Sequence, residues 1–326
     1  MHRQQQLIGD IGGTNARLAV CGSDDGRPQH IQTLPTNQFP SLEAAIRHYL
    51  DTLGNPTIHR AALAIANPIT GDWVQMTNHD WAFSILQMQA SLGLDQLELV
   101  NDFTALALSL PTLTEAEFWP IGGPAHAHPR FDAPVALLGP GTGLGVSGLV
   151  PDGHGKLLPL AGEGGHVTLC AQTEREFKVV QALHRQHGHA SAERALSGAG
   201  LSHVHAALAE LDMGTAVTTP WTPAEVTRRG LPGPEQDALC AEALQLFATW
   251  LGSVAGNLAL TLGARDGVWV GGGIPPRLGR SWWAQSGFRE AFEAKGRFRA
   301  YLQEVPVWFI DTQDPPALRG AAQALR

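Results

Sequence analysis

Cysteine and basic charge are both scarce in this sequence of 326 residues. Its three cysteines, Cys21, Cys170 and Cys240, are odd in number and far apart, so they predict neither a disulfide framework nor a Cys-x-x-Cys metal site. Such usage fits a reducing cytoplasm. Lysine and arginine number 22 against 30 acidic residues, for a formal net charge of −8. This balance argues against a nucleic-acid partner, which needs a basic face.

The sequence also lacks the apolar segments that membrane targeting requires. The first ten residues, MHRQQQLIGD, contain no hydrophobic region of a secretory signal. The most apolar long stretch, residues 246–264, carries Asn257 and several glycines, and is flanked by charge. It predicts a buried core helix rather than a membrane span. With 44% hydrophobic and 16% charged residues, the chain has the composition of a globular protein with a sizeable core.

The order of patterns predicts an α/β protein built from two similar halves. In the first half, strand, glycine turn and strand occupy residues 5–27, and a helix follows over 41–54, with Ser41 as its N-cap. Strands and helices then alternate to about residue 110, with one helix expected over residues 81–94. The second half repeats strand, glycine turn and strand from residue 135, and continues with helices near 174–187, 199–211 and 235–262. This alternation indicates a mixed sheet in each half, and the length suggests about two domains.

Three glycine-rich turns follow apolar strands, at residues 9–15, 139–145 and 271–273. Glycine allows the backbone to approach a ligand closely, and successive N–H groups in such turns form anion-binding nests. Each turn alone could be an ordinary tight hairpin. Three together, two of them with a threonine, favour a site for nucleotide phosphates.

Two better-known phosphate motifs are excluded. No G-x-x-x-x-G-K-[ST] occurs, so this is not a P-loop protein. A G-x-G-x-x-G does occur at Gly143, Gly145 and Gly148, with Glu163 at the distance expected for dinucleotide binding. That motif must open a helix, whereas the residues after Gly143 have the pattern of a strand. A dinucleotide site is therefore rejected.

Two acidic residues, Asp10 and Asp102, are candidates for the chemistry of such a site. Asp10 sits in the first glycine turn, where a carboxylate would repel phosphates unless a cation lay between them. This predicts Mg²⁺ at Asp10, bound through water, and the alternative is an aspartate that accepts hydrogen bonds from turn amides. Asp102 follows Asn101 at a strand-to-helix junction, where aspartate is a preferred N-cap. A cap at the helix N-terminus would lower the pKa of Asp102.

The histidines suggest no metal centre by their spacing. His184, His187 and His189 are clustered in HRQHGH, and two further pairs lie in HAHP and HVH. The chain has 14 histidines, many of them in polar turns. We therefore interpret these groups as chance clusters on the surface.

The features described so far lie in six longer segments: GDIGGTNARLA, ELVNDFTALALSLP, GPGTGLGVSGLV, LAGEGGHVTL, SAERALSGAGL and GGGIPPR. Taken together, these segments resemble the bacterial ATP-dependent glucokinases of the hexokinase/actin-like superfamily, and the resemblance runs over nearly the whole chain. It implies two α/β domains of the ribonuclease-H-like type with the sugar in the cleft between them. The domains would be residues 1–112 with 312–326, and residues 113–311. It also suggests a cytoplasmic homodimer that binds no membrane.

The resemblance further implies the reaction and the residues that perform it. ATP with Mg²⁺ would donate its γ-phosphoryl group to the 6-hydroxyl of glucose, the first step of glycolysis, with Asp102 as the general base. The residues that bind the sugar would be Asn101, Asp102, Glu163, His166, Glu193 and, as a neighbour, Asn78. Those that bind the nucleotide would be Gly9, Asp10, Gly12, Gly13, Thr14, Asn15, Gly141, Thr142, Gly143, Gly271, Gly272 and Gly273.

Other readings of the residues are weaker. The related ROK kinases carry a zinc-binding cysteine cluster after the Glu-x-x-His segment, where this chain has only Cys170, so no structural zinc is predicted. A sugar-responsive repressor would need a DNA-binding domain, yet the first glycine turn begins at Gly9. A catalytically inactive sugar-binding regulator would not need both Asp10 and Asp102. The residues alone leave open glucose against its near epimers, and ATP against polyphosphate or ADP as donor.

Overall fold

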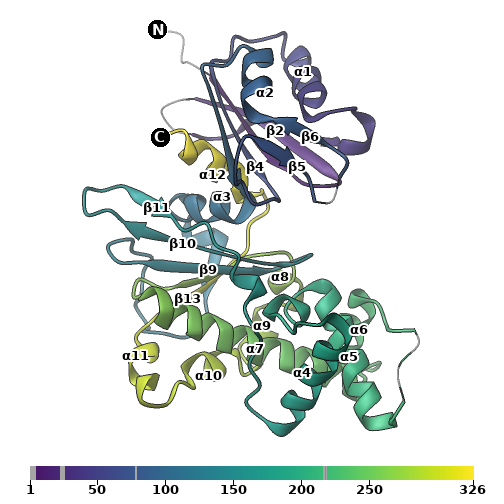
Figure 1. Ribbon diagram of the computed structural model, residues 1–326. Helices are drawn as coiled ribbons and strands as arrows, with labels where there is room; N and C mark the ends of the chain where they lie inside the picture. Colours follow the sequence, from purple (N-terminus) through teal and green to yellow (C-terminus); the bar gives the residue numbers. More distant parts are fainter. Residues whose placement is uncertain (1–4, 23–25, 78, 216, 218) are drawn as a thin grey trace. The chain divides into compact units, whose positions relative to one another are not determined.

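The computed structural model describes residues 5–22, 26–77, 79–215, 217 and 219–326. The chain divides into two compact units, each with its own sheet. Unit 1 comprises Met1–Thr114, Pro159–Ala161 and Thr312–Arg326, and unit 2 comprises Glu115–Leu158 and Gly162–Asp311. Figure 1 shows the elements of each unit.

Unit 1 is built on a five-stranded mixed sheet with the order β3-β2-β1-β4-β7. Its strands are β1 (Gln5–Ile11), β2 (Asn15–Gly22), β3 (Gln29–Pro35), β4 (Arg60–Ile65) and β7 (Gln96–Asn101). Strands β1 and β2 form an antiparallel hairpin, while β1, β4 and β7 are parallel. A small ribbon of β5 (Trp73–Gln75) and β6 (Ala82–Ser84) lies outside this sheet. The helices are α1 (Leu42–Thr52), α2 (Ile85–Leu92), α3 (Asp102–Ser109) and α12 (Pro316–Ala324).

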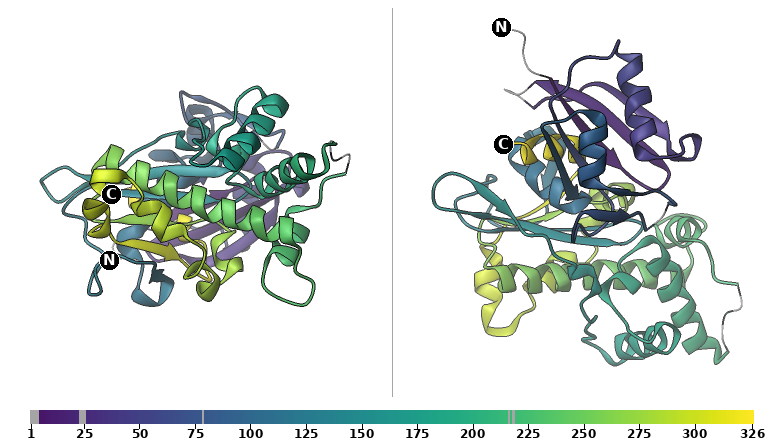
Figure 2. Two further views of the ribbon diagram at one scale, coloured as in Figure 1. Left: turned by 90° about the horizontal axis from the view of Figure 1, so that it is seen from below. Right: turned by 45° about the horizontal axis from the view of Figure 1, so that its top comes forward.

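Helices cover both faces of this sheet, as Figures 1 and 2 show. Because side chains alternate along a strand, Leu7 and Ile8 of β1 enter different cores. Leu7 packs in a cluster with Ile46 of α1, whereas Ile8 packs in a cluster with Leu318 of α12. In register, Ile11 pairs with Ile65, and Ile65 with Asn101. The three parallel strands therefore end at the same side of the sheet, which places the glycine turn and Asn101 at that side, with β4 between them.

Unit 2 has a six-stranded sheet with the order β11-β10-β9-β12-β13-β8. The strands are β8 (Phe118–Pro120), β9 (Val135–Pro140), β10 (Leu144–Pro151), β11 (Leu157–Pro159), β12 (Val268–Val270) and β13 (Val307–Ile310). An antiparallel hairpin, β9–β10, again lies beside a parallel strand, β12. This repeats the β1–β2–β4 arrangement of unit 1 and confirms the internal repeat predicted from the sequence.

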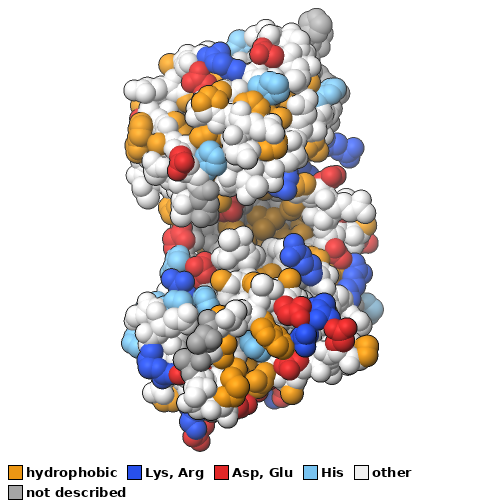
Figure 3. Space-filling model, turned by 90° about the vertical axis from the view of Figure 1, so that its right-hand side faces the viewer, with side chains coloured by type: hydrophobic (Ala, Val, Ile, Leu, Met, Phe, Trp, Pro, Cys, Tyr) orange, Lys and Arg blue, Asp and Glu red, His pale blue; other side chains and the backbone are white. Residues whose placement is uncertain are grey.

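The helices of unit 2 surround one large hydrophobic core. They are α4 (Glu174–His187), α5 (Gly198–Met213), α6 (Pro223–Gly230), α7 (Ala238–Leu262), α8 (Pro275–Leu278), α9 (Arg280–Trp283), α10 (Phe288–Glu293) and α11 (Arg299–Gln303). The 3₁₀ turns of the described chain are Thr36–Gln38, Leu110–Thr112, Glu115–Glu117, Gly164–His166, Ala192–Arg194 and Gly296–Phe298. On the face drawn in Figure 3, acidic and basic side chains are intermingled. Arg228 and Glu225 of α6 form one of the ion pairs of unit 2, with Nη2 and Oε1 2.9 Å apart.

Helix α7 has the length and hydropathy of a membrane span, but 56% of its most apolar window is buried within the protein. Gly252 and Gly256 face the carbonyl oxygens of Phe288 and Phe292, so α10 packs directly on the backbone of α7. A side chain at either glycine would separate the two helices. This confirms the predicted core helix.

Several local predictions are confirmed and two are wrong. Ser41 caps α1 by accepting a hydrogen bond from Ala44 N at 3.1 Å. Residues 144–151 form a strand, which confirms the rejection of a dinucleotide motif. The helix expected from residue 81 begins only at Ile85, because Ala82–Ser84 pair with β5. Strand β3 was not predicted, because its polar residues are largely exposed and show no apolar alternation.

Candidate active site

The first glycine turn joins β1 to β2 and is held in place by Thr36. Gly12 N donates to Asn15 O at 2.9 Å, which closes the turn. Thr36 N donates to Thr14 O at 3.0 Å, and Thr36 Oγ1 donates to Gly13 O at 2.8 Å. With these carbonyl groups fixed from outside, the turn has a defined shape. Gly9 lies further back within β1, where a Cβ would come within 2.7 Å of the Leu63 side chain. Packing thus accounts for this glycine.

Asp10 lies near the end of β1, directly before this turn. Its side chain is 17% exposed, and its Oδ2 accepts a hydrogen bond from Arg17 Nη1 at 3.0 Å. Burial raises the pKa of Asp10 and the Arg17 guanidinium partly offsets that rise. Asp10 thus pairs with a side chain of β2, and its place beside Mg²⁺ stays a prediction.

Asn101, and not Asp102, is the N-cap of α3, which corrects the expectation from the sequence. Asn101 Oδ1 accepts from Phe103 N at 2.9 Å and from Thr104 N at 3.3 Å. Asp102 is the first residue of the helix, and its Oδ1 accepts from Phe103 N at 2.9 Å. The cap oxygen of Asn101 is therefore already used, while its amide Nδ2 donates weakly to Asn67 O at 3.4 Å.

The pKa of Asp102 is raised to about 6, so the expected lowering by the helix N-terminus is also wrong. Burial is the largest cause, because removal from water disfavours the charged carboxylate. The hydrogen bond from Phe103 N lowers the pKa, and the nearby charge of Asp10 raises it again. Desolvation thus outweighs the helix terminus. The result is a carboxylate that is ionised at neutral pH and basic enough to accept a proton.

In unit 2, the turn between β9 and β10 is braced by Glu193 and by the start of α5. Glu193 Oε2 accepts from Leu144 N at 2.9 Å, and the carboxylate lies so close to Gly143 that a Cβ there would collide with it. Gly141 N donates to Gly143 O, and Gly198 N donates to Gly141 O, both at 2.8 Å. Glu193 therefore lies against the second glycine turn, although Glu193 and Leu144 are 49 residues apart in the sequence.

The third glycine turn lies beside the second. Gly272 has φ +84°, and a Cβ there would strike the carbonyl group of Pro140. Gly271 N donates to Leu138 O at 2.9 Å. The turns predicted to bind nucleotide in this half of the chain, Gly141–Gly143 and Gly271–Gly273, are thus adjacent at the ends of β9 and β12.

Glu163 precedes a 3₁₀ turn (Gly164–His166) that ends at His166 and packs against β10. His166 N donates to Glu163 O at 3.0 Å. A Cβ on Gly164 would meet Val146, and one on Gly165 would strike Leu144 O. The two glycines of EGGH are therefore required for close packing. The next residues reach the SAER segment, since Ala192 N donates to Val167 O at 2.8 Å. The structure thus brings the segments of Glu163, His166 and Glu193 together.

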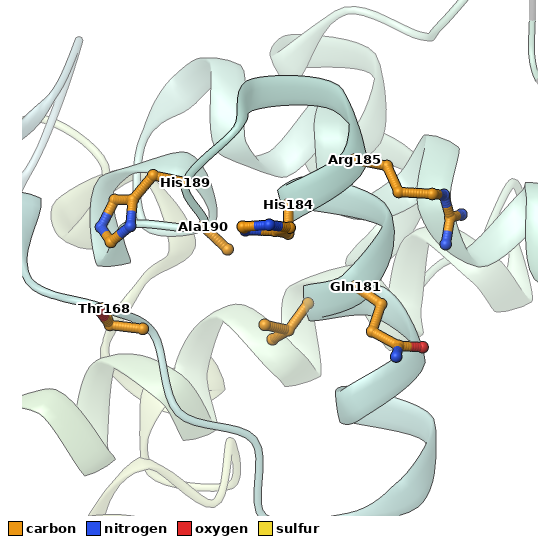
Figure 4. Close-up of a pocket in the computed structure, with 7 residues that line it drawn as sticks. Thr168, Gln181, His184, Arg185, His189 and Ala190 are labelled. Atoms are coloured by element: carbon orange, nitrogen blue, oxygen red, sulfur yellow. The ribbon is translucent and has the colours of Figure 1, made fainter.

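A pocket of about 470 Å³ adjoins this part of unit 2 (Figure 4). His184 and Gln181 of α4 line one side of it, and Thr168 lies across from them. His189 Nε2 lies 3.2 Å from His166 O, so one wall of the pocket contacts the Glu-x-x-His segment. Its lining contains none of the residues predicted to bind sugar or nucleotide, and it is a separate feature.

Asn78, the expected sugar neighbour, lies outside the residues that the structure describes. The interpretation of HVH as surface histidines is wrong: His205 is only 6% exposed, and the ring of His203 packs on that of His187 with centroids 4.7 Å apart. His205 is therefore buried, and His203 is partly buried beside His187 of α4.

Two α/β units of this kind, with an aspartate at a strand end and braced glycine turns, define a sugar kinase of the actin-like two-domain class. Comparison with known proteins identifies the family. The glucokinase family model matches residues 7–326, and the chain belongs to this family. The glucokinase of Chromobacterium violaceum is 51% identical over 98% of this chain and 89% of its own length, and that of Aromatoleum aromaticum is 50% identical over 98% and 94%.

Solved structures also include a glucokinase that is similar to this chain. A glucokinase from an Antarctic psychrotroph superposes with a TM-score of 0.87 at 35% identity, over 99% of this chain and 98% of the other. This likeness confirms the predicted α/β sugar kinase fold.

Proposed function

We propose that the chain transfers the γ-phosphoryl group of ATP to the 6-hydroxyl of glucose, giving glucose 6-phosphate and ADP. Membership of the glucokinase family supports the reaction. The observation that carries the mechanism is the state of Asp102: a largely buried carboxylate at the start of α3, with its pKa raised to about 6 and with Asp10 close enough to influence it. This is a base tuned close to neutral pH beside a phosphate-binding turn.

Asp102 would accept the proton of the attacking hydroxyl group. Phosphoryl transfer has a loose transition state with little charge on the attacking oxygen, so the base acts late and catalysis is mainly positioning. The Phe103 N–H holds one oxygen of Asp102 at 2.9 Å, which fixes the carboxylate for this task. Asn101 would donate its Nδ2 to a sugar hydroxyl, because its Oδ1 is engaged by the helix cap.

Glu163, His166 and Glu193 would bind the remaining hydroxyls. Carboxylates accept two or more hydrogen bonds each, and an imidazole can both donate and accept, which suits a polyhydroxylated ligand. Glu193 is held by Leu144 N and is therefore preorganised. Its contact with Gly143 would also link the sugar-binding residues to the phosphate turn.

The glycine turns would hold the nucleotide. The turns at Gly12–Asn15, Gly141–Gly143 and Gly271–Gly273 would present to ATP the backbone N–H groups that they do not already use. Those of Gly12, Gly141 and Gly271 donate within the protein. Asp10 fits a role at Mg²⁺, because its carboxylate is poorly hydrated and lies near a second carboxylate, so a cation would relieve an unfavourable local charge. When bound, Mg²⁺ would neutralise phosphate charge. Cys170 is an exposed free cysteine, and a zinc cluster of the ROK type is not part of the proposal.

The proposal extends to domains and assembly. Residues 1–112 with 312–326 would form one domain and residues 113–311 the other, a division supported by the two compact units. Sugar binding would bring them together and exclude water, so that ATP is not hydrolysed wastefully. Small-angle scattering with and without glucose should show compaction, and an unchanged profile would contradict closure. A cytoplasmic homodimer without nucleic-acid or membrane partners completes the proposal.

The deciding experiment is an assay that couples ADP release to a spectroscopic signal. The purified chain should release ADP with Mg-ATP only when glucose is added. Galactose and mannose test the hexose, while polyphosphate and ADP test the donor. The matched control is Asp102→Asn, which keeps the shape of the side chain and removes the base. If glucose caused no ADP release under any of these donors, the proposed function would be wrong.

A further inference from the structure

Three side chains of unit 2, away from the candidate active site, combine the ligand types that zinc prefers. They are His205 in the middle of α5, and Asp237 and Cys240 at the start of α7. One ligand atom from each, a ring nitrogen, a carboxylate oxygen and Sγ, lies within 4.8 Å of the other two. We propose that these residues bind one zinc ion, which joins α5 to α7. This site is independent of the proposed kinase chemistry.

The start of α7 holds two of the three ligands, Asp237 and Cys240, side by side. Asp237 is the N-cap of α7 and accepts a hydrogen bond from Cys240 N at 2.9 Å. An N-cap residue and the residue three positions later lie on the same face of a helix start, so the carboxylate and the thiol are held side by side. Helix α5 packs against α7 and supplies His205 from across that contact. Cys240 is fully buried and His205 is 6% exposed.

The buried imidazole supplies an independent reason to expect a ligand. Nδ1 of His205 is buried and has no hydrogen-bond partner in the described part of the chain. A buried polar atom without a partner is costly, and such atoms usually mark a bound water or ion. The ring is held by stacking on Trp221, with centroids 4.9 Å apart and planes at 15°. Arg229 covers the Trp221 ring at 4.6 Å and is itself paired with Glu225.

The chemistry of the three groups selects zinc or a similar divalent transition ion. Thiolate and imidazole favour zinc over Mg²⁺ or Ca²⁺, and zinc accepts a carboxylate as a third ligand and water as a fourth. On binding, the Cys240 thiol would lose its proton to solvent as the Zn–S bond forms, and no oxidant or reductant is needed. The two negative charges of Asp237 and the thiolate balance the ion. Zinc–ligand bonds of about 2.0–2.3 Å require only a small contraction of the cluster.

The position of the site gives it a structural consequence. Helix α5 begins at Gly198, whose N–H supports Gly141 in the second glycine turn at 2.8 Å. An ion that fixes α5 to α7 would therefore stiffen the base of that turn, and it would protect Cys240 from oxidation. The proposal differs from the expectation of no structural zinc, which rested on the segment after the Glu-x-x-His motif.

Cobalt is the best probe, because it replaces zinc and is coloured. The full chain, stripped with a chelator and kept reduced, is titrated with Co²⁺ and then with Zn²⁺. We expect one Co²⁺ per chain, a sulfur-to-cobalt charge-transfer band in the near ultraviolet, release of about one proton, and displacement by Zn²⁺. Zn²⁺ should also raise the thermal midpoint of unfolding. Absence of the charge-transfer band in the wild-type chain would overturn the proposal without any variant.

Two variants and one control locate the ion. Cys240→Ser and His205→Gln should each weaken Co²⁺ binding by more than about tenfold, and Cys240→Ser should abolish the sulfur band. Cys170→Ser removes an exposed thiol elsewhere in the chain and should leave band, stoichiometry and thermal shift unchanged. Glucose-dependent ADP release, or circular dichroism if the chain proves to be no kinase, checks folding. A band that persists in Cys240→Ser, or disappears in Cys170→Ser, would assign the ion elsewhere and refute this site.

Discussion

The raised pKa of Asp102 leads to a quantitative prediction for the pH dependence of catalysis. If Asp102 is the base, only its ionised form is active, and kcat/KM for glucose should follow that fraction. With a pKa of about 6, roughly 97% of the carboxylate is ionised at pH 7.5 and about 9% at pH 5. We therefore expect a loss of about tenfold between these pH values. An ordinary aspartate with a pKa near 3.9 would lose less than about 10%.

The assay is the initial rate of ADP release at low glucose and saturating Mg-ATP, from pH 5 to pH 8. Enzyme held at pH 5 and returned to pH 7.5 should regain full activity, which separates titration from unfolding. The same shift makes the folded chain bind this proton more tightly than the unfolded chain does, so this group favours folding at low pH. That contribution is lost as the pH rises from about 4 to about 6. An acid limb centred near pH 4, or the same limb in the residual rate of Asp102→Asn, would refute the reasoning.

Three substitutions test other parts of the structure. Asp102→Asn should lower kcat by roughly 10²–10⁴ with little change in glucose binding measured by calorimetry, and near wild-type turnover would exclude it as the base. Gly143→Ala should push Glu193 away from Leu144 N and raise the KM for glucose at least several-fold, so an unchanged KM would contradict the role of Glu193. Gly320→Ala should cost about 1–3 kcal/mol in urea unfolding, because its Cβ would strike the Ala105 carbonyl between α12 and α3. Gly71→Ala, which has open space, is the matched control and should be near neutral.

Much of the fold is readable from local chemistry. Ser41, Thr173 and Asp237 are side chains of the types that cap helices, and each accepts a backbone N–H at the start of α1, α4 and α7. Apolar runs with glycine between them predicted both hairpins. Strand β3 was not predicted, because an exposed, polar edge strand has no apolar period. Its formation depends on pairing with β2. Local patterns therefore identify elements that bury a face, and they miss those that do not.

The Asn101–Asp102 pair shows where prediction of the site from sequence stops. Both residue types are preferred N-caps, and the sequence led us to expect the cap at Asp102. The structure decides: Asn101 ends β7 with extended backbone, φ −61° and ψ 149°, and its side chain turns back to the helix. Asp102 is then left in the first turn among buried neighbours, and desolvation sets its pKa. That quantity depends on the surrounding packing, which no local pattern contains.

The surroundings of the two histidines of α5, His203 and His205, also depend on tertiary packing. In HVH the two histidines are two residues apart, which places His203 and His205 on different sides of a helix. These two side chains therefore cannot bind the same metal ion. Helix α5 is buried on several sides, and each histidine therefore meets a different neighbour: His203 packs on His187 of α4, and His205 lies beside Asp237 and Cys240 of α7. The Asp-x-x-Cys pair at a helix start is visible in the sequence, but its third partner, 32 residues earlier, is not. Clusters of this kind are built by helix packing, and a search for motifs with fixed spacing will pass over them.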